Sequence, residues 1–308
     1  MKKILLAGFA LVTIATSCQS NYDKTPSGLV YKVYPGKGGD SLKPGDIVKF
    51  KVQFYLTDRN GKKDSLLSAE TSMPNYTAVD TSERAKYSFM EIFPQLRSGD
   101  SAVVIMNVDS LRAKSMVDPN DSVVFVKGSN IKCYLKILND FKDQEAALAD
   151  YNKEAEAENQ REIKQVEEYM AKNNFKGEKT KSGAFVVIEQ PGDASVKADS
   201  GMVATIMYRG KLMSNGLVFD TNMDSTKGHT DPIIVNVGAR GVIQAWEEAL
   251  PYFGKGAKGK IFVPAFLGYG SMGAPPDIMP YANLVFDMEV LDVKPAPPAA
   301  SGPAIPQR

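Results

Sequence analysis

Two stretches of this chain resemble each other, and this internal repeat constrains the fold more than any other feature. The stretches are TPSGLVYKV, residues 25–33, and TKSGAFVVI, residues 180–188. Each opens a segment in which apolar and polar residues alternate, the pattern of half-buried β-strands. The alternating strands that follow are expected at 47–56 and 131–138 in the first repeat, and at 202–212 and 284–291 in the second. A period this long indicates two related domains rather than a solenoid.

A segment without Gly or Pro, Gln144 to Asn173, separates the repeats and is rich in Ala, Glu, Lys and Gln. This composition predicts a helix of about eight turns. Most of its apolar residues recur at spacings of three or four, but Glu158, Asn159 and Glu162 interrupt the stripe. Two interpretations remain open: a solvated spacer helix packed at its ends, or a coiled-coil interface that forms a homodimer.

These patterns predict an α+β chain of two domains joined by a long helix. We expect a signal segment at 1–17, a first domain at 18–140, a helical linker at 141–176, a second domain at 177–294 and a tail at 295–308. The tail is rich in Pro and Ala, so we expect it to be disordered.

The first residues have the order of an export signal: Lys2 and Lys3, then an apolar run from Ile4 to Ile14, then small residues up to Cys18. The sequence ATSC, residues 15–18, resembles a bacterial lipobox, which predicts cleavage before Cys18 and acylation of that cysteine. Acyl chains on one residue anchor a protein stably in a membrane. We therefore expect an exported, lipid-anchored protein of the cell envelope, at the periplasmic side of the outer membrane. The alternative is a plain signal peptide cleaved near Ser20.

Composition excludes several classes of function. Thirty-seven basic and thirty-six acidic residues give a net charge of +1, which argues against a nucleic-acid partner. The single histidine, His229, excludes a His-rich zinc site and, without a G-x-S-x-G motif, a Ser-His-Asp hydrolase. We expect His229 to be a solvent-facing loop residue. We also expect no metal and no cofactor, and no disulfide within the chain once Cys18 is acylated, because only Cys133 remains.

The second repeat carries five short motifs in a fixed order. They are YRGKL at 208–212, GLVFD at 216–220, GVIQAWEE at 241–248, VPAFLGYG at 263–270 and NLVFD at 283–287. Together they resemble the FKBP-type peptidyl-prolyl cis/trans isomerases over about 115 residues. Each motif alone is weak, but five in the same order make chance a poor explanation.

This resemblance implies an antiparallel sheet wrapped on one short helix, and a cleft for a proline ring. The residues that it implies for catalysis are Tyr208, Phe219, Asp220, Ile243 and Tyr269. Those that it implies for substrate binding are Ile233, Val242, Trp246, Ile278 and Phe286, with Val242, Ile243 and Trp246 at the start of the short helix and the proline ring on Trp246. Without the resemblance, the aromatic residues would be read as ordinary core and Asp220 as a turn acceptor.

The implied function is isomerisation of X-Pro bonds in unfolded or proline-containing exported polypeptides, the EC 5.2.1.8 activity. The alternative is a polypeptide-binding chaperone, or holdase, with little turnover. A third candidate, a structural lipoprotein of the envelope, has no positive support in the sequence beyond an inactive first domain.

The chain departs from the family pattern in the loop from Thr221 to Asp231, which is a few residues longer than usual. The family usually has an arginine there that pairs with the aspartate, whereas this loop offers only Lys227 and His229. We therefore expect Asp220 to lack its usual support.

The first repeat keeps the scaffold but not the site. Aligned by repeat, its counterpart of the Phe-Asp pair falls in Lys63–Leu66, its tryptophan position falls near Phe89, and no Tyr-Gly follows Leu111. The polar segment from Met73 to Lys86 is expected to be an insertion. We predict that the first domain is inactive as an isomerase.

Overall fold

The computed structural model describes residues 22–36, 38–68, 71–118 and 124–296. The predicted signal segment, Cys18 and nearly all of the predicted tail lie outside these residues. The chain divides into two compact units, Met1–Glu154 and Ala155–Arg308. The boundary falls inside the predicted helical linker.

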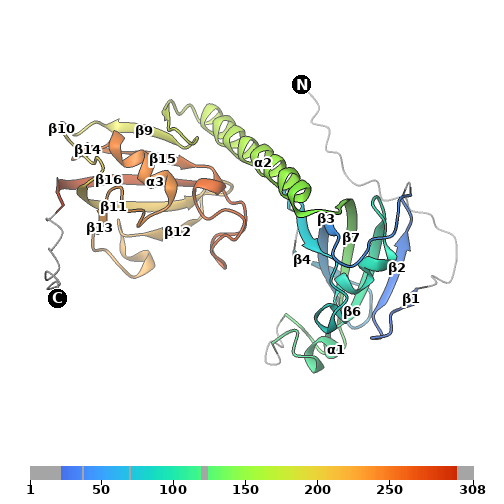
Figure 1. Ribbon diagram of the computed structural model, residues 1–308. Coiled ribbons are helices and arrows are strands. Elements are labelled where there is room, and N and C mark those ends of the chain that lie inside the picture. Colours follow the sequence, from blue (N-terminus) through green and yellow to red (C-terminus); the bar gives the residue numbers. More distant parts are fainter. Residues whose placement is uncertain (1–21, 37, 69–70, 119–123, 297–308) are drawn as a thin grey trace, which may run out of the picture. The chain divides into compact units, whose positions relative to one another are not determined.

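The second unit is built on an antiparallel sheet with the order β12-β11-β16-β15-β9-β8, and β13 also pairs with β11 (Figure 1). Its strands are β8 (Glu178–Lys179), β9 (Phe185–Gln190), β11 (Met202–Leu212), β12 (Val218–Thr221), β13 (Ile233–Asn236), β15 (Lys258–Val263) and β16 (Leu284–Pro295). A separate pair joins β10 (Asp193–Lys197) to β14 (Gly254–Lys255). One short helix, α3 (Gln244–Ala249), packs its buried Ala245, Trp246 and Ala249 into the core. The 3₁₀ turns are η3 (Ser225–Lys227), η4 (Leu250–Tyr252) and η5 (Ala265–Leu267).

The first unit repeats this topology. Its sheet has the order β1-β2-β6-β7-β3-β4 with β5 on β3, which matches β8-β9-β15-β16-β11-β12 with β13 on β11. The strands are β1 (Asp23–Lys24), β2 (Val30–Tyr34), β3 (Ile47–Thr57), β4 (Asp64–Ser68), β5 (Asn75–Ala78), β6 (Ser101–Asn107) and β7 (Asn130–Phe141). The helical pieces are η1 (Glu83–Ala85), η2 (Phe89–Gln95) and α1 (Val108–Ala113), and η2 stands where α3 stands in the second unit. The predicted α+β fold with two related domains is confirmed.

Strand registers give a residue-by-residue correspondence between the units. The register of β3 on β7 shifts between Lys49 and Phe50, and that of β11 on β16 shifts between Thr205 and Ile206. The outer pairs shift again, β3 on β4 after Phe54 and β11 on β12 after Gly210. Both irregularities agree on one alignment, in which Phe54 corresponds to Gly210.

The motif T-x-S-G that opens each repeat closes a turn and holds the short helix. Thr25 Oγ1 accepts the Leu29 N–H at 3.2 Å, and Thr180 Oγ1 accepts the Ala184 N–H at the same distance. Ser27 Oγ donates to Glu91 of η2, and Ser182 Oγ donates to Glu248 of α3, both at 2.6 Å. The repeated motif therefore ties the strand start to the helix that the sheet surrounds.

The segment from Met73 to Lys86 is not an insertion. It contains β5, which pairs with β3 at the position where β13 pairs with β11. Met73, Val79 and Ala85 are buried despite the polar residues around them. The expectation of an insertion was wrong because the segment is mostly polar in sequence, yet its few apolar residues are buried and its strand pairs with β3.

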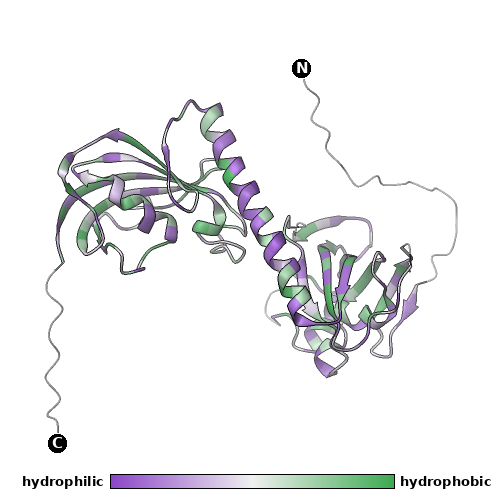
Figure 2. Cartoon of the chain, turned by 45° about the horizontal axis from the view of Figure 1, so that its top comes forward, coloured by the Kyte–Doolittle hydropathy of each residue, from purple (hydrophilic) through white to green (hydrophobic). Residues whose placement is uncertain are grey.

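The long helix, α2 (Gln144–Lys172), ends one residue earlier than predicted and carries both polar and apolar residues along its length (Figure 2). Its first part contacts the first unit, where Lys49 Nζ lies 2.7 Å from Asp150 and 2.8 Å from Glu154. Among the helices that the described residues form, none has the length and apolarity to cross a bilayer.

The part of α2 from Ala155 onward packs on the second unit. Ile163, Val166 and Met170 form a cluster with Phe185, Phe262 and Val285. Glu158 and Glu162, which interrupt the apolar stripe, are also buried. This end of the helix is therefore packed, and Ile163, Val166 and Met170 contact the second unit.

Phe262→Ala should lower the free energy of unfolding of the second unit by about 3–5 kcal/mol. Phe262 is fully buried beneath α2, with its ring centroid 5.0 Å from that of Phe175 and 6.1 Å from that of Tyr169. Urea unfolding followed by fluorescence of Trp246, the single tryptophan, reports on this unit. Leu217→Ala, at a site 53% exposed, is the matched control and should change stability by less than about 0.5 kcal/mol. Equal losses in the two variants would contradict the packing described.

Candidate active site

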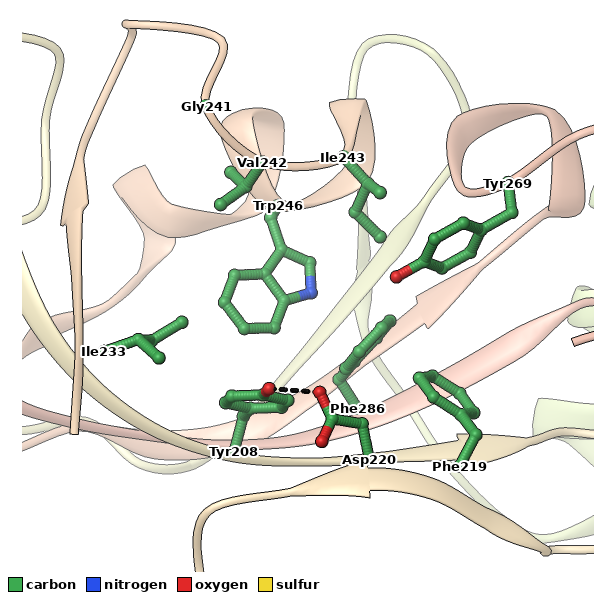
Figure 3. Close-up of a pocket in the computed structure, with 10 residues that line it drawn as sticks. All are labelled: Tyr208, Phe219, Asp220, Ile233, Gly241, Val242, Ile243, Trp246, Tyr269 and Phe286. Atoms are coloured by element: carbon green, nitrogen blue, oxygen red, sulfur yellow. Dashed lines mark hydrogen bonds between the residues drawn. The ribbon is translucent and has the colours of Figure 1, made fainter. Parts of the chain in front are cut away.

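One cleft of the second unit gathers most of the residues that the motifs single out. It has a volume of about 410 Å³. Its lining, shown in Figure 3, is Tyr208, Phe219, Asp220, Ile233, Gly241, Val242, Ile243, Trp246, Tyr269 and Phe286. Asp220 is the one charged residue among these ten. The cleft is therefore an apolar, aromatic site with a small polar part.

Aromatic rings in edge-to-face contact form the base of the cleft. Trp246, from α3, is 4% exposed, and its ring lies 5.4 Å from Tyr208 and 5.2 Å from Phe286, at interplanar angles of 79° and 86°. Phe219 meets Phe286 in the same way at 5.7 Å. Such contacts stabilise ring pairs beyond their burial, so they hold the base of the cleft in one arrangement.

Gly210 makes room for these rings. It pairs with Phe286 across β16 and with Asp220 across β12. A Cβ at Gly210 would lie 2.4 Å from the Phe219 ring and 2.9 Å from the Phe286 ring. Any larger residue would displace the two aromatic side chains that form this wall.

The polar part of the cleft centres on Asp220. The Tyr208 hydroxyl donates to Asp220 Oδ2, and His229 Nε2 lies 2.9 Å from Asp220 Oδ1. Burial by itself would raise the pKa of Asp220, but the hydrogen bonds to Tyr208 and His229 outweigh it and hold this pKa below its ordinary value. The carboxylate is therefore ionised at neutral pH.

The loop has no arginine to pair with Asp220, as expected, but Asp220 has another partner. His229 from the long loop takes the place of the family's usual arginine, although the His229 side chain is also 41% exposed, as a solvent-facing residue would be. The loop has its own anchors: Arg209 pairs with Asp224 at 2.6 Å, and Asn222 Nδ2 donates to the Ile206 and Asp231 carbonyls. Sequence alone did not reveal the contact because it depends on how this loop folds back.

Two tyrosine hydroxyls and one buried indole N–H belong to the residues that line the cleft. Burial, and then the nearby Asp220, raise the pKa of both Tyr208 and Tyr269, so both hydroxyls keep their protons at neutral pH. Figure 3 shows the Tyr269 hydroxyl directed into the space beside Trp246 and Phe286. The Trp246 indole nitrogen is buried and has no hydrogen-bond partner among the described residues.

The predicted site residues fall into two groups. Nine of the ten line the cleft, but Ile278 does not: it is 3% exposed and belongs to the core, where its backbone pairs with Ala274. Gly241 lines the cleft and was missed, although it lies in the motif before Val242. The short helix begins at Gln244, so Val242 and Ile243 precede it rather than lie on it.

The corresponding positions of the first unit carry different side chains. By register, Tyr208 corresponds to Val52, Phe219 and Asp220 to Leu67 and Ser68, and Phe286 to Cys133. The predicted alignment of the Phe-Asp pair with Lys63–Leu66 was therefore too early in the chain. Phe54 replaces Gly210, and its ring lies 5.6 Å from that of Phe89, the counterpart of Trp246. An aromatic side chain thus packs on the helix side where the second unit has only a glycine.

His229→Ala should raise the pKa of Asp220 toward its ordinary value, because one of the groups that lower it is removed. A folded-state pKa below the unfolded one contributes stability that is present above the ordinary value of 3.8 and is lost as the pH falls through the folded-state pKa. The titration midpoint of the Asp220 carboxyl carbon, followed by NMR, measures the shift. Lys227→Ala, in the same loop, is the control and should leave the midpoint unchanged. An unchanged midpoint in His229→Ala would show that the contact does not persist in solution.

Comparisons with known proteins found similar sequences of one family. A family model described as FKBP-type peptidyl-prolyl cis-trans isomerase matches residues 194–291. The chain is 38% identical over 159 residues to the FKBP-type peptidyl-prolyl cis-trans isomerase FkpA of Escherichia coli (strain K12), a stretch that covers 51% of this chain and 54% of FkpA. It thus spans about half the length of that relative. A crystal structure of FkpA from Escherichia coli aligns with a TM-score of 0.37 at 30% identity, over 50% of this chain and 70% of that one.

A shorter relative is covered more completely. The peptidyl-prolyl cis-trans isomerase FPR2 of Saccharomyces cerevisiae is 38% identical over 104 residues, which are 34% of this chain and 74% of that protein. The chain belongs to the FKBP-type peptidyl-prolyl cis-trans isomerase family.

Proposed function

We propose that the second unit catalyses cis/trans isomerisation of X-Pro peptide bonds, the EC 5.2.1.8 activity. The observation that carries this proposal is the aromatic cleft on Trp246, with an ionised Asp220 and the Tyr269 hydroxyl at its edge. Membership of the family supports the same reaction.

The reaction needs a cleft of this kind rather than a nucleophile. Resonance gives the C–N bond partial double-bond character, which opposes rotation with a barrier of about 18–20 kcal/mol. The resonance form responsible is charge-separated, and transfer from water to an apolar site disfavours it. The twisted, less polar transition state is favoured relative to the planar ground state, which is catalysis by differential binding.

Each residue has a proposed role. The proline ring rests on Trp246, between Val242, Ile233 and Phe286. The Tyr269 hydroxyl and the Ile243 backbone N–H hydrogen-bond the carbonyl groups that flank the proline. The first N–H groups of a helix have no partner within it, so the Ile243 N–H, just before α3, is a suitable donor. Phe219 packs on Phe286 and closes the wall.

Asp220 adds an electrostatic contribution. Its negative charge next to the bound amide disfavours negative charge on the amide oxygen and so weakens the resonance that opposes rotation. Its hydrogen bonds to Tyr208 and His229 hold the carboxylate at the cleft edge. Tyr208 is thus a support for Asp220 as well as part of the wall.

We further propose that the protein acts on exported polypeptides, anchored to the envelope through acylated Cys18. The support is the order of basic, apolar and small residues before that cysteine. Slow prolyl isomerisation limits many folding reactions, which gives an exported isomerase a role in folding of its clients.

Asp220→Ala should lower kcat/KM for a short Ala-Leu-Pro-Phe peptide about tenfold, equivalent to about 1.4 kcal/mol of transition-state stabilisation. The reason is the loss of the only charge that lines the cleft. The measurement uses residues 19–308 in a spectroscopic isomerisation assay. Ser68→Ala changes the corresponding position of the first unit and should leave kcat/KM unchanged.

Different outcomes separate the parts of this proposal. Loss of activity in Ser68→Ala would place catalysis in the first unit. Full activity in Asp220→Ala, Phe219→Ala and Trp246→Ala alike would show that the cleft described is not the site. An inactive parent chain would remove the isomerase assignment altogether.

A second candidate function, polypeptide binding with little turnover, is favoured by one observation. Ile234, Met272 and Met279 are 70%, 81% and 60% exposed, and they lie in the segments that supply Ile233 and Tyr269 to the cleft. Large exposed apolar residues bind unfolded chains, and the flexible thioether of Met adapts to many partners. Suppression of aggregation of a denatured proline-free protein by the parent chain, lost in Met272→Ser/Met279→Ser, would support this holdase activity.

A further inference from the structure

The helix α2 contacts the loop that presents Tyr269 to the cleft. Glu162 Oε2 accepts the backbone N–H of Phe266 at 2.7 Å. Glu162 is 2% exposed, so this contact is buried and lies within the second unit. In its ionised form Glu162 makes this a charge-assisted hydrogen bond, which is stronger than a neutral one.

A second contact lies one helical turn further on. Gln165 Oε1 accepts from Asn283 Nδ2 at 2.9 Å, and Asn283 Oδ1 in turn accepts the Ala265 N–H at 2.9 Å. Residues three apart share a helix face, so Glu162 and Gln165 reach the same segment together. Two successive N–H groups of the loop therefore depend on α2, one directly and one through Asn283.

The loop needs these acceptors because it cannot cap itself. The 3₁₀ turn η5 begins at Ala265, and the residue before it, Pro264, provides no side-chain hydrogen bond to the turn. Buried backbone N–H groups without a partner are costly. The helix supplies what the local sequence does not.

The same turn sets the position of Tyr269. The Ala265 carbonyl accepts the N–H groups of Gly268 and Gly270, at 2.9 and 2.8 Å, on either side of that tyrosine. The Tyr269 carbonyl accepts the Gly273 N–H at 3.0 Å. A displacement of Ala265 and Phe266 is thus transmitted through two hydrogen bonds to the backbone around Tyr269.

We propose that Glu162 and Gln165 are positioning residues, which hold the η5 turn so that the Tyr269 hydroxyl points into the cleft. This inference rests on the proposed isomerase function and assigns part of the catalytic geometry to α2, a helix that contributes no residue to the cleft lining.

The electrostatics of Glu162 agree with a functional rather than a stabilising role. Burial, against the opposing effect of the Phe266 N–H, raises the pKa of Glu162 to about 7, and Glu158 adds to the rise. Arg161 on the same helix opposes this rise in pKa. The segment from Pro264 to Leu267 that Glu162 contacts has only apolar side chains, and Asn283, which accepts the Ala265 N–H, is neutral. A folded-state pKa above the unfolded value means that stability present below the ordinary value of 4.5 is lost as the pH rises through about 7. Glu162→Leu removes this cost of a buried charge at pH 8, and it also leaves the Phe266 N–H without its acceptor.

The experiment is a double-mutant cycle on residues 19–308 with the proline peptide. Glu162→Leu should lower kcat about tenfold with KM unchanged, less than the loss of about a hundredfold that a displacement of 1 Å can cause. In the Tyr269→Phe background the same change should alter kcat by less than about twofold, because the hydroxyl that it misplaces is already absent. Glu162→Gln keeps an acceptor oxygen and should restore most of the activity. Glu168→Leu, the same substitution at an exposed site on α2, should behave as the parent chain.

Unfolding at pH 8, followed by Trp246 fluorescence, separates positioning from stability. Reduced kcat with undiminished stability supports the inference, whereas a kcat that falls only in step with stability overturns it. If Glu162→Leu does not fold, Gln165→Leu tests the second contact by the same cycle. Two further results would overturn the inference when the parent chain is active. One is a loss of kcat in Glu162→Leu that simply adds to the loss in Tyr269→Phe, and the other is full activity in Glu162→Leu. An inactive parent chain would instead contradict the proposed function, so failure of that function can be told apart from failure of the positioning inference.

Discussion

The pairing of β11 with β16 is the constraint on which the rest of the second unit depends. It sets Gly210 opposite Phe286, and the absence of a side chain at Gly210 leaves room for the Phe219 and Phe286 rings. Trp246 then meets Phe286 and Tyr208 edge to face. The shape of the cleft therefore follows from one register and one glycine, since a slip of register by one residue would turn these side chains to the other face of the sheet.

The first unit has the same topology as the second but different side chains at the positions of the cleft. Its strands keep the order, the register shifts and the Ser-Glu contact to the short helix. Phe54 at the Gly210 position packs against Phe89, and Ser68 replaces the aspartate. Scaffold and site are thus separable: main-chain pairing and the T-x-S-G turn maintain the fold, while a few side chains on one face decide whether a cleft exists.

The helix α2 has a different relation to each unit. Lys49 of β3 binds its first part through ion pairs with Asp150 and Glu154. On the second unit it buries an apolar stripe together with Glu162, a group that is expensive to bury. The cost of that burial, offset by hydrogen bonds to an otherwise uncapped turn, is the physical reason to connect this helix with the cleft.

The sequence by itself determined the two-domain α+β organisation and the long helix, because alternation and composition are local signals. Nine of the ten residues that the family resemblance implied for the site line the cleft, and that resemblance rests on ordered motifs. Only the tertiary structure decided the rest. The contact of His229 with Asp220, the place of β5 in the sheet, the burial of Ile278 in the core and the contact of Glu162 with Phe266 join segments that are separated along the chain. Such contacts depend on loop paths and on which face of a helix is buried, and these are set by packing rather than by local pattern.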